Sequence, residues 1–151
     1  MISPTRHLGI AWIMLGCALA AHVTDEALTG FLDIYNRTVL EIGQCIGVRP
    51  PAFDFTEWLA GLVVGICIVL ALTPVAFANR SWWRPLARAF ALLMLLNGLG
   101  HIAGTVAGRT FRDITFPRPM PGFYSSPLLL AASSYLLVCL RRTRARAATS
   151  P

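Results

Sequence analysis

Ionisable side chains recur at helical spacing in one apolar stretch near the start of this sequence. At about 100° per residue, His22, Asp25, Glu26, Thr29 and Asp33 fall within one stripe roughly 100° wide. The other positions of the stretch are mostly apolar. Because lipid would not tolerate such side chains, a polar stripe on a membrane helix points into the bundle or a cavity.

A second polar pair lies in a later apolar stretch, where Asn97 and His101 share one helical face. If both stretches cross a membrane in the same direction, His22 and Asn97 lie about 21 and 18 Å above the inner ends of their helices. Glu26 and His101 come one turn higher. We therefore expect His22 with Glu26, and Asn97 with His101, at matching height on parallel helices.

These side chains support two kinds of catalytic chemistry. His22, Glu26 and His101 can hold Zn²⁺ or non-haem iron through imidazole nitrogens and a carboxylate oxygen. The same groups can perform general acid–base catalysis, with Glu26 as the principal acid or base and the histidines as its proton partners. Asp25 would then tune Glu26, and Asn97 would orient a neighbour or the substrate.

Other interpretations of the same residues stay open. A proton or metal-ion pathway also concentrates ionisable groups inside a bundle. A haem held through a histidine is another alternative, although the chain has no CxxCH motif. A hydrogen-bond network that only sets helix register contributes about 0.6 kcal/mol on average, which is little for two histidines and two carboxylates. We therefore favour a functional site.

Further residues on the same half of the chain are candidates for substrate binding. Thr29 and Asp33 continue the first polar stripe. Arg109 and Arg112 are suited to a phosphate or carboxylate headgroup, or to contact with lipid. Tyr124 suits a membrane interface, where its ring and hydroxyl meet both phases.

Composition indicates the elements that must position these side chains. Of the 151 residues, 56% are hydrophobic and 13% charged, and the net charge is +6. The basic residues are all arginine and lie between apolar runs, which argues against a nucleic-acid partner and for contact with membrane lipids. We predict an all-α, four-helix transmembrane bundle, a single domain over 1–151, with helices at about 8–36, 57–78, 84–108 and 124–141.

The arginines also predict the orientation. Alternating sides of the four segments carry eight and five of the 13 arginines, and the richer side, which holds both termini, should be cytoplasmic. We expect a bacterial inner-membrane protein. The sequence does not decide whether it forms a homo-oligomer. A cleaved signal peptide ending near Ala21 is the rival interpretation of the first segment.

Two residue types predict how the helices are placed. Interfacial tryptophans are expected at Trp12, Trp82 and Trp83. Close helix packing is expected at Gly61, Gly65, Gly100, Gly104 and Gly108.

Three short motifs resemble those of a known family. His22-Val23-Thr24-Asp25-Glu26 resembles the signature of the HXXEE-domain small bacterial integral membrane proteins, and Asn97 with His101 resembles their later Asn-x-x-x-His element. The Pro121-Gly122-Phe123-Tyr124 entry to the last helix also resembles theirs. The first acidic position departs from the family pattern, since Asp25 is a shorter carboxylate than glutamate. The resemblance implies a shared polar site and names no reaction. Emopamil-binding sterol isomerases are a looser analogy in architecture, with histidine and glutamate inside a helical bundle.

The sequence as a whole predicts an acid–base isomerase or hydrolase, metal-assisted or not, that acts on a lipophilic small molecule. The alternative is a non-enzymatic transporter, ligand-binding protein or accessory membrane subunit. A transporter usually shows internal repeats or broken helices, and neither is evident in the sequence.

Overall fold

The computed structural model describes residues 4–48, 50–109, 114–115 and 118–148. Helices make up most of this part of the chain, with one isolated antiparallel bridge between Arg109 and Thr115. The all-α fold class is confirmed. The helices are α1 (Pro4–Thr29), α2 (Phe31–Ile46), α3 (Phe55–Ala71), α4 (Thr73–Ala78), α5 (Trp83–Ala107) and α6 (Ser126–Ala148).

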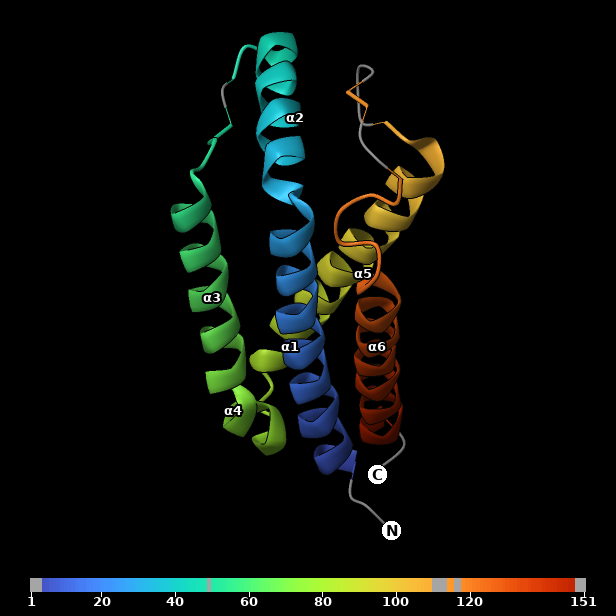
Figure 1. Ribbon diagram of the computed structural model, residues 1–151. Helices are drawn as coiled ribbons and strands as arrows, with labels where there is room; N and C mark the ends of the chain where they lie inside the picture. The colour runs from blue at the N-terminus through green and yellow to red at the C-terminus, as the bar shows by residue number, and fades with distance from the viewer. Residues whose placement is uncertain (1–3, 49, 110–113, 116–117, 149–151) are drawn as a thin grey trace.

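Helix α1 lies between the other elements (Figure 1). It packs against α3 and α4 on one side and against α6 on the other, while α5 packs mainly against α6. Helix α2 continues beyond the end of α1 and projects from the opposite end of the molecule to α4 (Figure 1). We call these the α2 end and the α4 end. The beginning of α1 and the end of α6 both lie at the α4 end.

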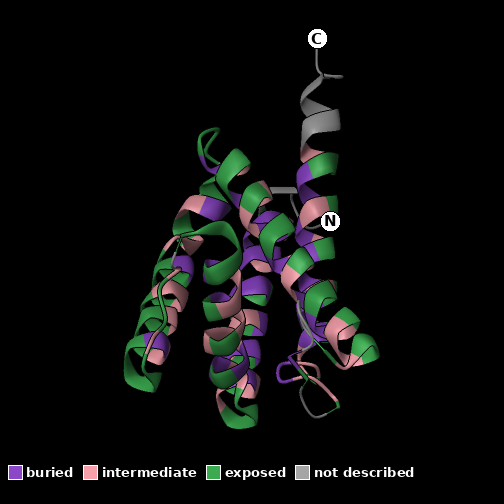
Figure 2. Ribbon diagram, turned by 90° about the horizontal axis from the view of Figure 1, so that it is seen from above, coloured by how far each residue is buried: buried purple, intermediate pink, exposed green. Residues whose placement is uncertain are grey.

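An apolar core holds α1, α5 and α6 together near the α4 end. Buried leucines and alanines of the three helices surround Trp12 and Trp83, whose rings meet edge to face at 5.2 Å. The Trp12 indole N–H donates to the carbonyl of Val69 at 2.7 Å, which attaches α3 to the same core. Figure 2 shows buried residues on the inward faces of the helices and exposed residues outside.

Three segments are long and apolar enough to cross a membrane: Arg6–Thr29, Phe55–Ala78 and Trp83–Ala107. Their outward faces stay apolar, as the exposed Val63, Val64 and Ile68 of α3 illustrate. A helix that is hydrophobic all round suits a lipid environment rather than water. Helix α6 is not among these segments, since Arg141 and Arg142 follow its apolar part within the helix.

The expected first and second helices are each interrupted. The predicted helix at 8–36 is wrong as one element, because Gly30 takes the left-handed conformation (φ 80°) and separates α1 from α2. The predicted helix at 57–78 divides at Leu72, where Pro74 has no N–H for the carbonyl four residues earlier. The third helix agrees within one residue at each end. The fourth begins at Ser126 and continues past 141 to Ala148.

Two expectations about packing are also corrected. Trp12 and Trp83 are fully buried in the core instead of lying at an interface, whereas Trp82 is exposed. The predicted glycine faces do not hold helices together: the space beside Gly61, Gly65 and Gly100 is open, Gly104 faces Met120, and Gly108 faces Arg118. Close helix contacts are made instead at Gly9 and Gly16 of α1, against Phe77 of α4 and Leu70 of α3, and at Gly98 of α5, against Leu130 of α6.

Candidate functional site

Three buried ionisable side chains meet where α1 and α5 approach each other, toward the α2 end. The Oε1 atom of Glu26 lies 3.4 Å from Nε2 of His22 and 3.1 Å from Nε2 of His101. His22, Glu26 and His101 are 0%, 5% and 4% exposed. The two imidazole rings meet edge to face at 4.7 Å. We call these three residues the His–Glu–His cluster.

Helical spacing positions two members of the cluster. His22 and Glu26 are four residues apart on α1 and therefore share one face. On α5, Asn97 and His101 share a face in the same way, and Asn97 Oδ1 lies 3.0 Å from His22 Nε2. The matching height expected for these two pairs is confirmed. Their chemical roles stay predictions.

Asp25 contacts the cluster indirectly, through Ser125. One carboxylate oxygen of Asp25 accepts hydrogen bonds from the Ser125 backbone N–H at 2.9 Å and from its hydroxyl at 2.8 Å. The Ser125 Oγ atom in turn lies 2.8 Å from Nδ1 of His22. Asp25 thus orients His22 through Ser125, on the Nδ1 side of the ring, and is not a member of the cluster that contains Glu26.

The turn before α6 covers the cluster with backbone. The carbonyl of Pro121 lies 2.5 Å from Nδ1 of His101. Gly122 has φ 83°, and a Cβ added there would lie 2.7 Å from Cε1 of His101 and 3.1 Å from Cγ of Glu26. Only glycine combines this backbone conformation with so close an approach. Thr29 Oγ1 accepts from the Gly122 N–H at 3.3 Å and so helps to place the turn.

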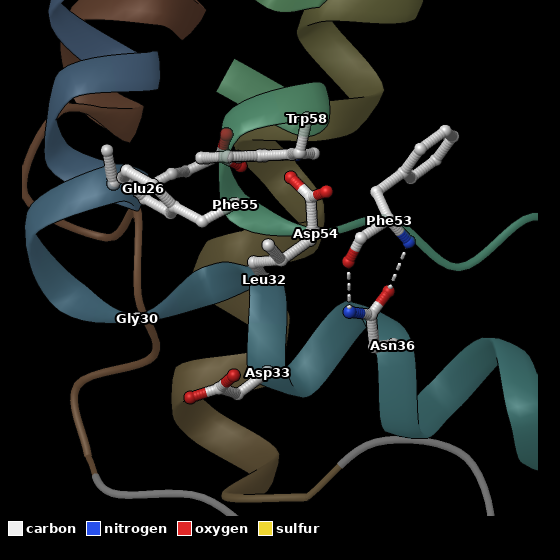
Figure 3. A pocket seen from close by; sticks show the side chains of 10 residues that line it. Glu26, Gly30, Leu32, Asp33, Asn36, Phe53, Asp54, Phe55 and Trp58 are labelled. Carbon is white, nitrogen blue, oxygen red and sulfur yellow. Dashed lines mark hydrogen bonds between the residues drawn. The ribbon is translucent and has the colours of Figure 1, made fainter. Parts of the chain in front are cut away.

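A pocket of about 290 Å³ opens beside Glu26, between α2 and the beginning of α3. Figure 3 shows Trp58 and Phe55 from α3 on one side, and Leu32, Asp33 and Asn36 from α2 on the other. The Asn36 side chain donates to the carbonyl of Phe53 at 2.8 Å and accepts from its N–H at 3.1 Å. This pair ties the segment before α3 to α2 and shapes the wall of the pocket.

The predicted substrate-binding residues divide into three groups. Asp33 lines the pocket, although it belongs to α2 and not to the α1 stripe. Thr29 contacts the turn at Gly122, and Tyr124 is 70% exposed, so neither lines the pocket. Arg109 is exposed beyond the end of α5 and is likewise not among the lining residues. Arg112 lies outside the described residues.

Several residues of the site were not predicted from the sequence. Ser125, the Pro121 carbonyl and Gly122 come from the turn before α6, and Trp58, Phe53 and Asn36 form the pocket. Helical periodicity carries no signal for a loop that folds back onto a helix. A Pro-Gly pair followed closely by two serines was the available hint that this turn is special.

The donor set of the cluster fits both chemistries that the sequence left open. The ligand atoms of His22, Glu26 and His101 all lie within 4.8 Å of one another, which is close enough to surround one metal ion. A carboxyl group between two imidazoles is also suited to proton exchange with a bound molecule. Comparisons of the chain with family models, with curated proteins and with solved structures found no match.

Proposed function

We propose that this protein is a membrane enzyme that performs acid–base chemistry on a lipophilic small molecule. The observation that carries the proposal is the position of Glu26. Its carboxyl group is nearly buried between two imidazoles, yet it also lines the pocket between α2 and α3. A buried ionisable group that a small molecule can reach is typical of catalytic sites.

The pocket supports a substrate with a lipophilic body. Trp58, Phe53, Phe55 and Leu32 supply apolar surface, and Glu26 supplies the group that exchanges protons. His22 and His101 would donate or accept the proton that Glu26 gains or loses in each cycle. Isomerisation, hydration and hydrolysis all need such a proton transfer, and they are the reaction classes we propose.

We further propose that the chain spans the bacterial inner membrane four times, with both termini in the cytoplasm. Three helical segments have the length and hydropathy for this, and α6 would be the fourth span, with Arg141 and Arg142 at the membrane surface. The excess of arginine at the α4 end supports a cytoplasmic location for that end. In this arrangement the pocket opens toward the outer leaflet.

The motifs around His22 and Asn97 support a site shared with the HXXEE-domain proteins. In this proposal the Asp25 position needs a carboxylate that reaches Ser125 and not the cluster itself. A shorter side chain than glutamate can serve there, which accounts for the departure at Asp25.

Isotope incorporation tests the enzyme proposal even while the substrate is unidentified. Membranes that contain the wild-type protein would be incubated with a lipid extract in deuterated or heavy-oxygen water, and the lipids analysed by mass spectrometry. Protonation of carbon introduces deuterium, whereas hydration or hydrolysis introduces heavy oxygen. We expect one label to enter a lipid, and Glu26→Gln to slow this by about 10²–10⁴-fold.

Glu41→Gln is the matched control. Glu41 lies on α2 away from the pocket lining, so its replacement should leave the incorporation rate unchanged. If wild-type protein introduces neither label into any lipid, the enzyme proposal is wrong. The transporter, ligand-binding and accessory-subunit alternatives would then stand. The open space beside Gly61 and Gly65 of α3 would favour an accessory subunit, because another helix could approach closely there.

A further inference from the structure

We infer that His22, Glu26 and His101 bind one divalent transition-metal ion, with zinc as the best match to two imidazoles and one carboxylate. The inference deepens the proposed function by assigning a cofactor to the same site, but its test needs no substrate. Hydrogen bonding around the two rings, their burial and the ligand spacing carry it.

The hydrogen position on His101 follows from its partner. The Pro121 carbonyl, 2.5 Å from Nδ1, can only accept a hydrogen bond, so Nδ1 carries the hydrogen. The neutral ring then has its lone pair on Nε2. That atom points at Glu26 Oε1, another acceptor, at 3.1 Å.

The same accounting applies to His22. When the single hydroxyl hydrogen of Ser125 is directed to the Asp25 carboxylate at 2.8 Å, the Ser125 oxygen accepts from Nδ1 of His22. In that tautomer the neutral His22 ring also has its lone pair on Nε2, as a metal ligand requires. That atom faces Glu26 Oε1 at 3.4 Å and Asn97 Oδ1 at 3.0 Å.

Two imidazole lone pairs and a carboxylate oxygen thus converge in a buried space. A single hydrogen, on either Glu26 or one imidazole, can join only two of these three atoms, and Asn97 offers a further partner to His22 alone. One metal ion satisfies all three atoms at the same time.

The distances from Glu26 to the two imidazoles match those between neighbouring ligands of a metal ion, and all three ligand atoms lie within 4.8 Å of one another. Zinc bonds of about 2.0–2.1 Å in tetrahedral geometry place neighbouring ligand atoms roughly 3.3 Å apart. Glu26 Oε1 lies 3.4 and 3.1 Å from the two Nε2 atoms. The fourth position would belong to Asn97 Oδ1 or to a water molecule from the pocket, which Glu26 also lines.

The surroundings of the two rings are also those of metal-binding histidines. Such histidines donate their other ring N–H to a carbonyl, a carboxylate or a comparable acceptor, which sets the ring orientation. Here His101 has the Pro121 carbonyl, and His22 has Ser125 backed by Asp25. Together with Glu26, the Asp25 carboxylate would balance the charge of a divalent ion.

Metal analysis of protein purified in detergent tests the inference. The purification tag must contain no histidine, and the third histidine of the chain provides the control. His7 lies near the α4 end, 3.2 Å from the Tyr135 hydroxyl. We expect one zinc or iron ion per chain in wild type and in His7→Ala. His101→Ala should lose it, and Ser125→Ala should bind about 10- to 100-fold more weakly.

Cobalt substitution keeps the test decisive if His101→Ala does not fold. Co²⁺ bound to nitrogen and oxygen ligands in wild-type protein should give visible ligand-field absorption. Added zinc should displace the cobalt and abolish this absorption. If wild-type protein binds no stoichiometric metal and gives no cobalt spectrum, or if His101→Ala folds and keeps its metal, the inference is wrong. If the protein binds metal but introduces no isotope label, the metal site is supported and the enzyme proposal is wrong. If metal-free protein introduces the label, the enzyme proposal is supported and the metal inference is wrong.

Discussion

At the scale of single residues, two adjacent carboxylates have different environments because of helix geometry. Asp25 and Glu26 are separated by about 100° around α1. One therefore faces the turn before α6, where Ser125 donates two hydrogen bonds to it, and the other faces His101 on α5. We interpret Glu26 as the group that acts on substrate or metal and Asp25 as a positioning residue.

Gly122 is the residue at which the turn meets the cluster, and its replacement makes a specific prediction. Gly122→Ala should lower the melting temperature in detergent and disturb the metal site, since left-handed backbone costs a non-glycine residue about 1–2 kcal/mol. The added Cβ would also overlap the His101 ring.

Gly61→Ala is the matched substitution for Gly122→Ala. No atom lies within 4 Å of the added Cβ, and Gly61 is inside helix α3. Alanine in a helix interior is favoured over glycine by about 0.5–1 kcal/mol, so the melting temperature should stay the same or rise. Equal melting temperatures and equal metal content for the two variants would contradict the role assigned to Gly122.

At the scale of elements, the interruption at Gly30 decides what α2 contributes. In an uninterrupted helix, Asp33 would lie on the same face as the polar residues of α1. The left-handed residue at Gly30 redirects the chain, so that Leu32, Asp33 and Asn36 form one wall of the pocket. Asn36 then holds the segment before α3 through its two hydrogen bonds to Phe53 (Figure 3).

Gly30→Ala should therefore alter the direction of α2. We expect a lower melting temperature, by the left-handed penalty of about 1–2 kcal/mol, and a changed distance between spin labels at Cys45 of α2 and at Ser81→Cys. The other three cysteines would be replaced by serine in this experiment. Pulsed electron resonance measures the distance distribution.

Gly47→Ala serves as the control for strain alone. Gly47 also has a positive φ (69°) and open space around its Cα, but it lies at the far end of α2, beyond the label. It should lower the melting temperature by a similar amount and leave the distance unchanged. If Gly30→Ala and Gly47→Ala change the distance between the labels equally, or if neither changes it, Gly30 does not set the direction of α2.

At the scale of the whole molecule, the proposed topology places α2 on the outer side of the inner membrane and the loop between α4 and α5 in the cytoplasm. Cys45 is exposed on α2, so a membrane-impermeant maleimide should label it in intact cells. The variant with Cys45→Ser and Ser81→Cys should react only after the membrane is permeabilised, because Ser81 lies at the arginine-rich α4 end.

The reverse labelling pattern would overturn the orientation. Cys17 and Cys67 lie inside candidate spans, which keeps them away from a charged reagent in both variants. A cleaved first segment would be detected in the same samples, since mass spectrometry of the labelled protein would show the loss of residues up to about Ala21.

The sequence by itself determined the helical class, three membrane-compatible segments and the proximity of His22 and Glu26 to Asn97 and His101. The helical class and the apolar segments depend on local periodicity and hydropathy, whereas the proximity was predicted from helix rise together with the condition that both helices cross in the same direction. Ser125, Gly122, the Pro121 carbonyl and the pocket wall were decided by the tertiary structure, because they depend on a turn that folds back onto α1 and α5. The burial of Trp12 and Trp83 belongs with them: an amphipathic aromatic ring suits an interface or a core equally well, and only the packing of α1 against α5 and α6 selects the core.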